Sequence, residues 1–187
     1  MSHYSVLIAL LVLFGSHSVR AEKHLVNLSY WNWAEEFQMS KGETVQKANS
    51  NFSALGLEYE FSSGLASQGW NLAPALLIGQ ATGGNATGDL VYVASYQKFV
   101  GASLKATWFW RFERRVYLEA GVLAIYRPLS WPVSDDGISG ESGTAANMGL
   151  VTNLRVRLTP SLDFCQSLGV IGNRGRTLWS AGFGYRF

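Results

Sequence analysis

The sequence contains little cysteine and little charge, and each shortage excludes a class of protein. It has 1 cysteine, so no disulfide can form within the chain. Only 15% of its 187 residues are charged, against about 25% in an ordinary soluble domain. The net charge of +2, without a basic cluster, argues against binding to nucleic acid. With 4 prolines and no glycine triplet period, the chain is not collagen-like.

What the sequence does contain is hydrophobic and aromatic residues, which make up 48% and 13% of the chain. A chain this apolar is not intrinsically disordered, and its length suits one domain. After residue 21 no stretch approaches 18 consecutive apolar residues, so the sequence predicts no transmembrane helix. The apolar excess therefore needs another explanation.

The N-terminus has the pattern of a secretory signal peptide. Residues 6–14 are an apolar run, and Val19 and Ala21 provide small residues at the −3 and −1 positions of a cleavage site, although no Lys or Arg precedes the run. We expect residues 1–21 to be the signal peptide and residues 22–187 to be the exported domain. The alternative is a membrane anchor, but the run is far shorter than the ~20 residues that span a bilayer.

The exported part alternates between apolar and polar residues over stretches of about ten residues. Successive side chains of a β-strand point to opposite faces, so this period of two predicts strands. The clearest stretch is residues 102–112, where the even positions are apolar and most of the odd positions are polar. The other candidate strands are residues 25–33, whose phase is unclear, and residues 53–61, 70–78, 90–97, 116–126, 148–158, 162–170 and 179–187.

The apolar faces of these strands are predicted to form the outside of a barrel. A soluble β-sandwich also alternates, but its apolar face fills the core and its polar face meets water. Here the polar faces are rich in Gly and Ser and mix charges of both signs, as a confined interior would. The apolar faces carry aromatic residues at their ends, as in the interfacial girdles of membrane barrels. Strands of about 9 to 11 residues also match a tilted transmembrane strand.

The connections support the same architecture. Residues 113–115 and 159–161 are predicted to be tight turns, whereas residues 35–50 and 128–145 are predicted to be long polar loops. Membrane barrels have short turns on one side and long loops on the other, and these four connections sort in that way. Residues 90–97 keep the alternation phase of residues 102–112, so we interpret the two as one long strand. The expected fold is an all-β, eight-stranded antiparallel up-and-down transmembrane barrel, with ten strands as the alternative.

The C-terminus carries a recognisable ending. The sequence from Trp179 to Phe187 alternates apolar and small residues and ends in phenylalanine. This ending resembles the C-terminal assembly signal of Gram-negative outer-membrane β-barrels, and the chain resembles the small class of the OmpA membrane domain, OmpX and OmpW. The resemblance implies export, insertion by the barrel-assembly machinery, and contact with outer-membrane lipid and lipopolysaccharide. We expect a monomer. The implied signal residues are Trp179, Phe183, Tyr185 and Phe187.

The scarcity of histidine argues against catalysis. Some small outer-membrane barrels are lipid-modifying enzymes, and that resemblance implies a catalytic His beside Ser or Asp. The 3 histidines of this chain are His3, His17 and His24. The first two leave with the predicted signal peptide, and His24 is at the start of the exported domain. One His and the single Cys165 are too few for a metal site, so we expect no metal and no cofactor. Cys165 is predicted to pack inertly in the interior.

The strongest candidate site is a network of charges predicted to face the interior. Strand order places charges of residues 105, 111, 119, 155 and 157 on neighbouring strands. A ring of charges is typical of a selectivity filter, but an eight-stranded barrel is only wide enough for side chains to fill it. We therefore favour a salt-bridged plug over a pore. The network comprises Glu58, Glu60, Lys105, Arg111, Glu119, Arg155, Arg157, Asp163 and Arg186.

The sequence thus predicts a non-enzymatic outer-membrane barrel with a plugged polar interior. Its expected role is in envelope structure or in interaction and adhesion through surface loops, with the loop partner unidentified. Asp135 and Asp136 in the second long loop lack the spacing of a calcium loop. The alternatives are, in order, a narrow pore for ions or small apolar solutes, a lipid-modifying enzyme and a soluble ligand-binding barrel.

Overall fold

The computed structural model describes most of the exported domain. The described residues are 24–41, 43–63, 67–86, 96–128, 138–141, 146–172 and 176–187. The predicted signal peptide, residues 1–21, lies outside them. The described residues form nine strands: β1 (His24–Lys41), β2 (Thr44–Ser62), β3 (Gln68–Ala86), β4 (Tyr96–Arg111), β5 (Val116–Tyr126), β6 (Ile138–Glu141), β7 (Ala146–Arg157), β8 (Leu162–Ile171) and β9 (Arg176–Arg186).

Eight of the strands close into an antiparallel barrel. Each of them pairs with its neighbours in chain order, and β1 pairs with both β2 and β9, which closes the sheet. The remaining strand, β6, has only four residues and pairs with the last residues of β1, 38–41. The prediction of an eight-stranded up-and-down barrel is therefore confirmed. In the described segments no helix is long and apolar enough to cross a membrane.

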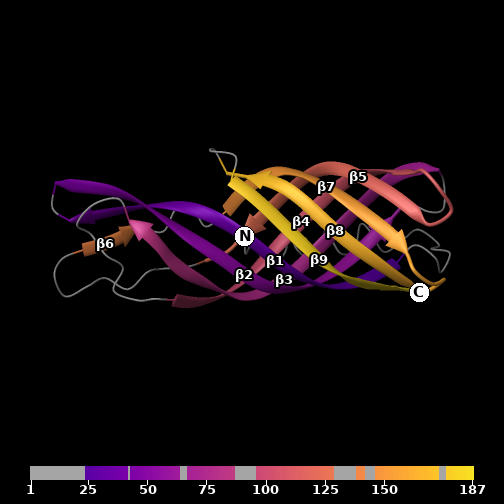
Figure 1. The fold of residues 1–187 in the computed structure, drawn as a ribbon, viewed down its shortest axis with the longest axis horizontal. Coiled ribbons are helices and arrows are strands. Elements are labelled where there is room, and N and C mark those ends of the chain that lie inside the picture. Colours follow the sequence, from indigo (N-terminus) through magenta and orange to yellow (C-terminus); the bar gives the residue numbers. More distant parts are fainter. Residues whose placement is uncertain are drawn as a thin grey trace, which may run out of the picture.

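The two ends of the barrel differ (Figure 1). At one end, which we call the turn end, residues 112–115 and 158–161 connect strands directly, and the chain reaches its C-terminus. Phe112 N–H donates to the Val116 carbonyl, and Leu158 N–H donates to the Leu162 carbonyl, so both predicted tight turns are present. At the other end, which we call the hairpin end, β1 and β2 extend past the remaining strands.

One predicted loop is a β-hairpin instead. Residues 35–50 continue β1 and β2, which stay paired from Glu35↔Ser50 to Lys41↔Thr44. The prediction of a loop was wrong because polar residues predominate here, so neither face is consistently apolar, and outside the apolar layer a strand no longer needs an apolar side. Part of the second predicted loop, residues 138–141, forms β6 against residues 38–41. Asp135 and Asp136 lie outside the described residues.

The predicted phases of the strands are present in the structure. On β4, for example, Leu104 and Trp108 point outward and Ser103 and Lys105 point inward. The unclear phase of β1 is now resolved: Trp31 and Trp33 point inward. Tyr96 and Gln97 belong to the same strand as Ala102, as the shared phase predicted; residues 90–95 lie outside the described part.

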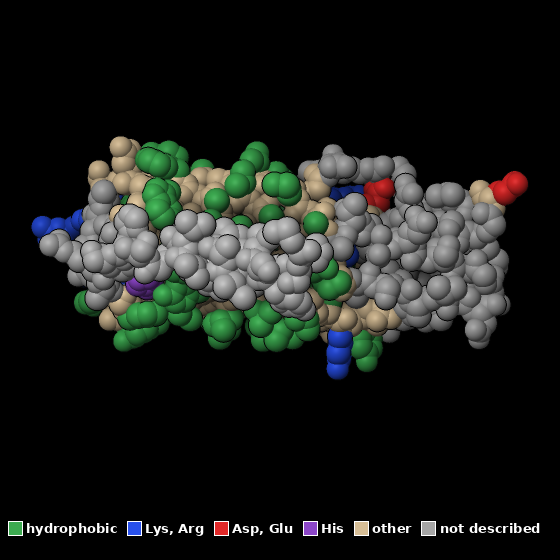
Figure 2. Space-filling model, turned by 180° about the vertical axis from the view of Figure 1, so that it is seen from behind, with side chains coloured by type: hydrophobic (Ala, Val, Ile, Leu, Met, Phe, Trp, Pro, Cys, Tyr) green, Lys and Arg blue, Asp and Glu red, His purple; other side chains and the backbone are tan. Residues whose placement is uncertain are grey.

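An apolar belt covers the outer wall, and charged side chains lie toward the ends (Figure 2). Aromatic side chains sit at both edges of this belt. Trp110 and Phe112 are exposed at the turn end, and Tyr126 is exposed at the hairpin end. Tyr30 and Trp179 contact each other across β1 and β9, with 5.5 Å between ring centroids. This distribution is that of a barrel with an apolar layer around it and interfacial aromatic girdles.

Candidate functional site

Most of the buried polar side chains lie in the lumen of the barrel. Together with a cluster of aromatic rings they form four layers along its axis. We call them the mouth at the turn end, the charge cluster, the aromatic plug, and the cap at the hairpin end. The mouth comprises Arg111, Arg157, Asp163 and Arg186, and the charge cluster comprises Glu58, Glu60, Lys105, Glu119 and Arg155. The aromatic plug is centred on Trp31, Trp33, Phe52 and Phe99, and the cap comprises Glu35, Arg127 and Asn147.

The charge cluster is an ion-pair network whose five members are all buried. Lys105 Nζ lies 2.6 Å from Glu58 Oε2. The Arg155 guanidinium donates hydrogen bonds to both Glu60 and Glu119. Because charges buried in a low-dielectric interior are costly without partners, this pairing is what allows five of them to share one layer.

Neutral side chains complete the hydrogen bonding of Glu119. Thr107 Oγ1 donates to Glu119 Oε2 at 3.0 Å, and Asn153 Nδ2 donates to the same atom at 2.9 Å. Strand register explains the arrangement, because Glu119 of β5 pairs with Asn153 of β7 and with Phe109 of β4. A carboxylate with three donors around it is held in one orientation.

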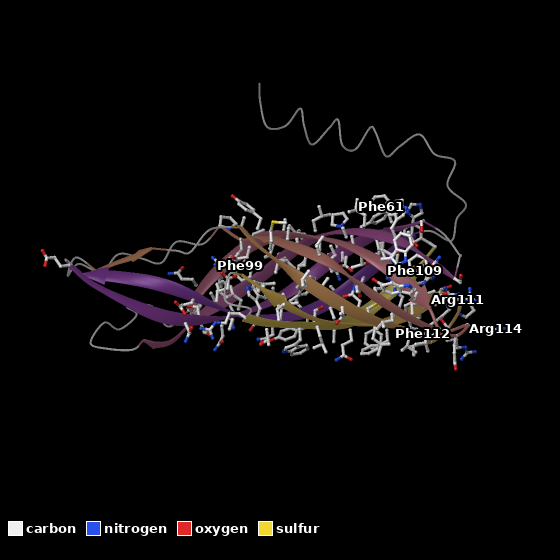
Figure 3. The ribbon with its side chains drawn as sticks, turned by 90° about the horizontal axis from the view of Figure 1, so that it is seen from above. Phe61, Phe99, Phe109, Arg111, Phe112 and Arg114 are labelled. Atoms are coloured by element: carbon white, nitrogen blue, oxygen red, sulfur yellow. The ribbon has the colours of Figure 1, made fainter. Side chains whose placement is uncertain are left out.

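The aromatic plug fills the lumen on the side of the charge cluster that faces the hairpin end. The Trp33 and Phe52 rings stack with centroids 5.1 Å apart, and Phe99 meets both rings edge-on. Figure 3 shows Phe99 inside the barrel toward the hairpin end. The indole N–H of Trp33 is satisfied by Glu35 Oε1 at 2.7 Å. The remaining buried members are Ala54, Leu77, Ala81, Leu123, Ile125, Val151, Ile171 and Leu178.

Gly56 provides the space in which Trp31 lies. A Cβ atom on Gly56 would be 2.5 Å from Trp31 Nε1, a distance that real side chains do not tolerate. The Trp31 indole N–H donates to Ser29 Oγ at 2.7 Å. Lys105 Nζ lies 5.3 Å from the centroid of the Trp31 ring, so this tryptophan contacts the charge cluster as well as the plug.

The cap closes the plug at the hairpin end. Arg127 Nε donates to Glu35 Oε1 at 2.8 Å, and its Nη2 pairs with the other carboxylate oxygen. Asn147 Nδ2 also donates to Glu35, at 2.8 Å. The guanidinium carbon of Arg127 lies 4.6 Å from the centroid of the Phe52 ring. The ion pair is bidentate and therefore rigid.

The mouth at the turn end is less completely paired. Arg186 donates to Asp163, whose side chain is fully buried. Arg157 lies farther from Asp163, with 3.7 Å between Nε and Oδ1, and its guanidinium lies over the Tyr117 ring. Arg111 makes no ion pair with any described residue.

Little open space remains between these layers. A cavity of about 10 Å³ lies in the charge cluster, and a second of about 10 Å³ lies between the cluster and the mouth. Each has room for about one water molecule. Cys165 lines the first cavity and packs beside Arg155. Both cavities among the described side chains of the lumen are therefore small.

The nine predicted network residues fall into two groups, the charge cluster and the mouth, and Arg111 is the member that makes no ion pair with a described residue. The cap was missed by sequence reasoning. Glu35 was assigned to a loop, and Arg127 follows the last alternating residue of its strand. The available signal was the odd-numbered series Trp31, Trp33, Glu35, which keeps one phase along β1.

The residues of the predicted C-terminal signal lie on the outer wall. Trp179, Phe183, Tyr185 and Phe187 are all exposed there. His24 Nδ1 lies 2.9 Å from the Tyr59 hydroxyl, and its ring stacks on that of Phe187. Within the described ranges no group of three or more His, Cys, Asp or Glu side chains is placed to hold a metal ion.

Comparison with known proteins shows the fold. No protein-family model and no curated protein matches the sequence. Ail, the attachment invasion locus protein of Yersinia pestis, is similar with a TM-score of 0.51 and 16% identity over 89% of this chain and 99% of Ail. Ail in complex with the heparin analogue sucrose octasulfate gives a TM-score of 0.50 and 17% identity over the same shares. OprG of Pseudomonas aeruginosa gives 0.48 and 13% identity over 90% of this chain and 97% of OprG. The likeness to Ail shows that the chain has the fold of the small eight-stranded outer-membrane barrels.

Proposed function

We propose that the protein is a non-enzymatic integral barrel of the bacterial outer membrane, with a sealed lumen and an outer hairpin that contacts external surfaces. The apolar belt supports the membrane location, because a water-soluble barrel would expose these side chains to water at high cost. The short turns would face the periplasm and the hairpin would face outward. The observation that carries the proposal is the aromatic plug, which fills the lumen between the two buried ion-pair layers.

The sealed lumen is tested by conductance. Purified full-length protein in a planar bilayer is expected to give no steady unitary currents. A variant that removes the plug, Trp33→Ala with Phe99→Ala, is expected to admit water and raise the ion leak. Unitary currents from the wild type that Arg155→Ala abolishes would show that the lumen is a pore.

The hairpin supports the second half of the proposal. β1 and β2 have 18 and 19 residues, against the ~9 to 11 that a membrane-spanning strand needs. Beyond Trp33 the chain of β1 continues for eight residues, which is roughly 26 Å of strand. β6 adds a third strand to this extension. Such a protruding sheet is a platform for recognition outside the membrane, where its backbone edge can pair with other chains.

Shortening the hairpin tests this role. Phe37 and Ala48 are paired in register, so replacing residues 38–47 by Asn-Gly would close a shorter hairpin without disturbing Glu35. We expect unchanged heat-modifiable mobility on gels and reduced attachment of cells to host-cell monolayers and heparin-coated surfaces. The matched control is the same Asn-Gly replacement of residues 113–115 at the opposite end. Attachment that persists with the shortened hairpin would contradict the role.

The contacts of His24 support the non-enzymatic half. Its ring contacts the Tyr59 hydroxyl and the rings of Phe61 and Phe187, without a Ser or Asp side chain among these contacts. An acid–base dyad requires such a partner within hydrogen-bond reach. Lipid A from cells with and without the gene is expected to be identical, and a gene-dependent change in acylation would contradict the proposal.

A further inference from the structure

We propose that the mouth of the lumen at the turn end binds a phosphate-type oxyanion between Arg111, Arg157 and Arg186, with Arg155 deeper in the lumen. This site goes beyond the proposed function, because neither a sealed lumen nor a surface hairpin requires it. Two observations carry it: an excess of positive charge at the mouth, and buried arginine donors that lack acceptors.

The charges of the lumen are unevenly distributed. The side chains of the mouth are three arginines and one carboxylate, Asp163, which is a formal excess of +2, and two of the arginines, Arg157 and Arg186, pair with Asp163. In the charge cluster three carboxylates face two cations, which leaves −1. The cluster carboxylates are already engaged by Lys105 and Arg155. The positive excess therefore remains at the turn end, where an anion is the complementary ligand.

Several donors at this end lack an acceptor among the described residues. They are Nε of Arg155, Nη2 of Arg157 and Nε of Arg186, whereas Nε of Arg157 lies 3.7 Å from Asp163 Oδ1, which is itself without a hydrogen bond. Arg155 is only 6% exposed, and the cavity beside it has room for about one water molecule. Buried donors are almost always paired in proteins. An oxyanion supplies several strong acceptors at once and matches the fork of donors on a guanidinium.

The strands bring these arginines to the mouth from different parts of the inner wall, with β4 and β9 on opposite sides of the barrel. Arg111 of β4 pairs in register with Tyr117 of β5, and Tyr117 pairs with Arg155 of β7. The guanidinium carbon of Arg157 also lies over the Tyr117 ring, 5.5 Å from the ring centroid. Arg186 of β9 donates a hydrogen bond to Asp163 of the neighbouring strand β8. The cavity between the charge cluster and the mouth is lined by Ser62, Asn71, Phe109, Tyr117, Glu119, Arg155 and Arg186.

The site is reachable from the turn end. The Arg157 and Arg186 side chains are 22% and 12% exposed, so an oxyanion between them lies at the open mouth, outside the cavity, which has room for about one water molecule. Figure 3 shows Phe109 and Arg111 at this end of the barrel and Arg114 beyond them, at the tip of the turn. Arg114 is exposed and outside the mouth, which makes it a matched control with the same side chain.

The test follows the arginine Nε–H resonances by NMR. Full-length protein in zwitterionic micelles is titrated with inorganic phosphate, with chloride at equal ionic strength as the reference. We expect saturable shifts of the Arg155, Arg157 and Arg186 signals and none for Arg114. Arg157→Gln is expected to raise the phosphate Kd about tenfold or more, because it removes a charge-assisted hydrogen bond. Arg114→Gln is expected to leave the Kd unchanged.

A second arm separates a free anion from a lipid headgroup. The same resonances are recorded without phosphate in nanodiscs of phosphatidylcholine and of phosphatidylglycerol. Shifts with phosphate alone identify a soluble anion, and shifts with phosphatidylglycerol identify a headgroup; both support the site. Arg157→Lys, which keeps the charge, replaces Arg157→Gln if the latter fails to fold. Resonances that move with neither probe, or Arg114 shifts equal to those of Arg157, would overturn the proposal, because water or general screening would then account for the arginines.

Discussion

Arg155 and Glu60 form an ion pair across the lumen, from strands on opposite sides of the barrel. Glu60 lies on β2 and Arg155 on β7, and three strands separate β2 from β7 in either direction around the closed sheet. Arg127 and Glu35 form a second such pair nearer the hairpin end, between the end of β5 and β1. Two ion pairs therefore tie opposite walls of the barrel together, with the aromatic plug between them.

Removing Arg155 should destabilise the barrel strongly. Arg155→Met leaves Glu60 and Glu119 buried without their cation, which we expect to cost about 3–5 kcal/mol. Combining it with Glu60→Gln and Glu119→Gln should recover most of this loss, because no unpaired charge remains. The measurement is urea-induced unfolding in lipid vesicles, followed by tryptophan fluorescence. The exposed Arg114→Gln is the control, expected within about 0.5 kcal/mol of the wild type. An equally stable Arg155→Met would show that the pair contributes nothing.

The outer wall can be tested for contact with lipid. Leu57 is 54% exposed on the outside of β2, next to Leu28 and Leu76. In a membrane, Leu57→Arg should cost about 2–4 kcal/mol, because the charge enters the apolar layer. Glu43→Arg, at the exposed tip of the hairpin, should cost nothing measurable. Unfolding in vesicles measures both. If Leu57→Arg were as harmless as exposed substitutions are in water, the wall would not be in lipid.

The cap and the plug should be energetically coupled. Phe52→Ala opens a cavity in the plug and should cost about 3–5 kcal/mol. Arg127→Gln removes the ion pair to Glu35 and the contact with the Phe52 ring. In a double-mutant cycle we expect a coupling of about 0.5–2 kcal/mol between the two substitutions. Additive losses would mean that the guanidinium gains nothing from the ring.

The proposed C-terminal signal predicts a separation between assembly in cells and stability in vitro. Phe187 is half-exposed on the outer wall, so Phe187→Ser should change refolding into vesicles only slightly. If the assembly machinery reads this residue, the amount of protein in the outer membrane should fall several-fold in cells. Cell fractionation with heat-modifiable mobility measures that amount. Leu158→Ser, exposed near the same end of the barrel, is the matched control. Normal membrane levels of Phe187→Ser would contradict the role.

Local alternation predicted most of the wall correctly, and its failures have a common physical cause. Along β4 and β7 one face meets an apolar layer and the other a polar lumen, so the two faces read differently. Along β1 both faces carry aromatic rings, since Trp33 fills the plug and Tyr30 lies outside. Beyond the apolar layer polar residues predominate in the hairpin and neither face is consistently apolar, so its sequence has the character of a loop. Alternation reports a difference between two faces and is uninformative where they are alike.

The sequence by itself determined the period of two, the inward and outward faces of most strands, and the short turns at one end. Those properties depend on the geometry of a single extended chain. Only the tertiary structure decided which charges meet. Glu60 and Arg155 are 95 residues apart, and Glu35 and Arg127 are 92 apart. Whether such pairs face each other depends on the number, tilt and stagger of the strands when the sheet closes. No local pattern encodes that closure, because it is a property of the whole barrel.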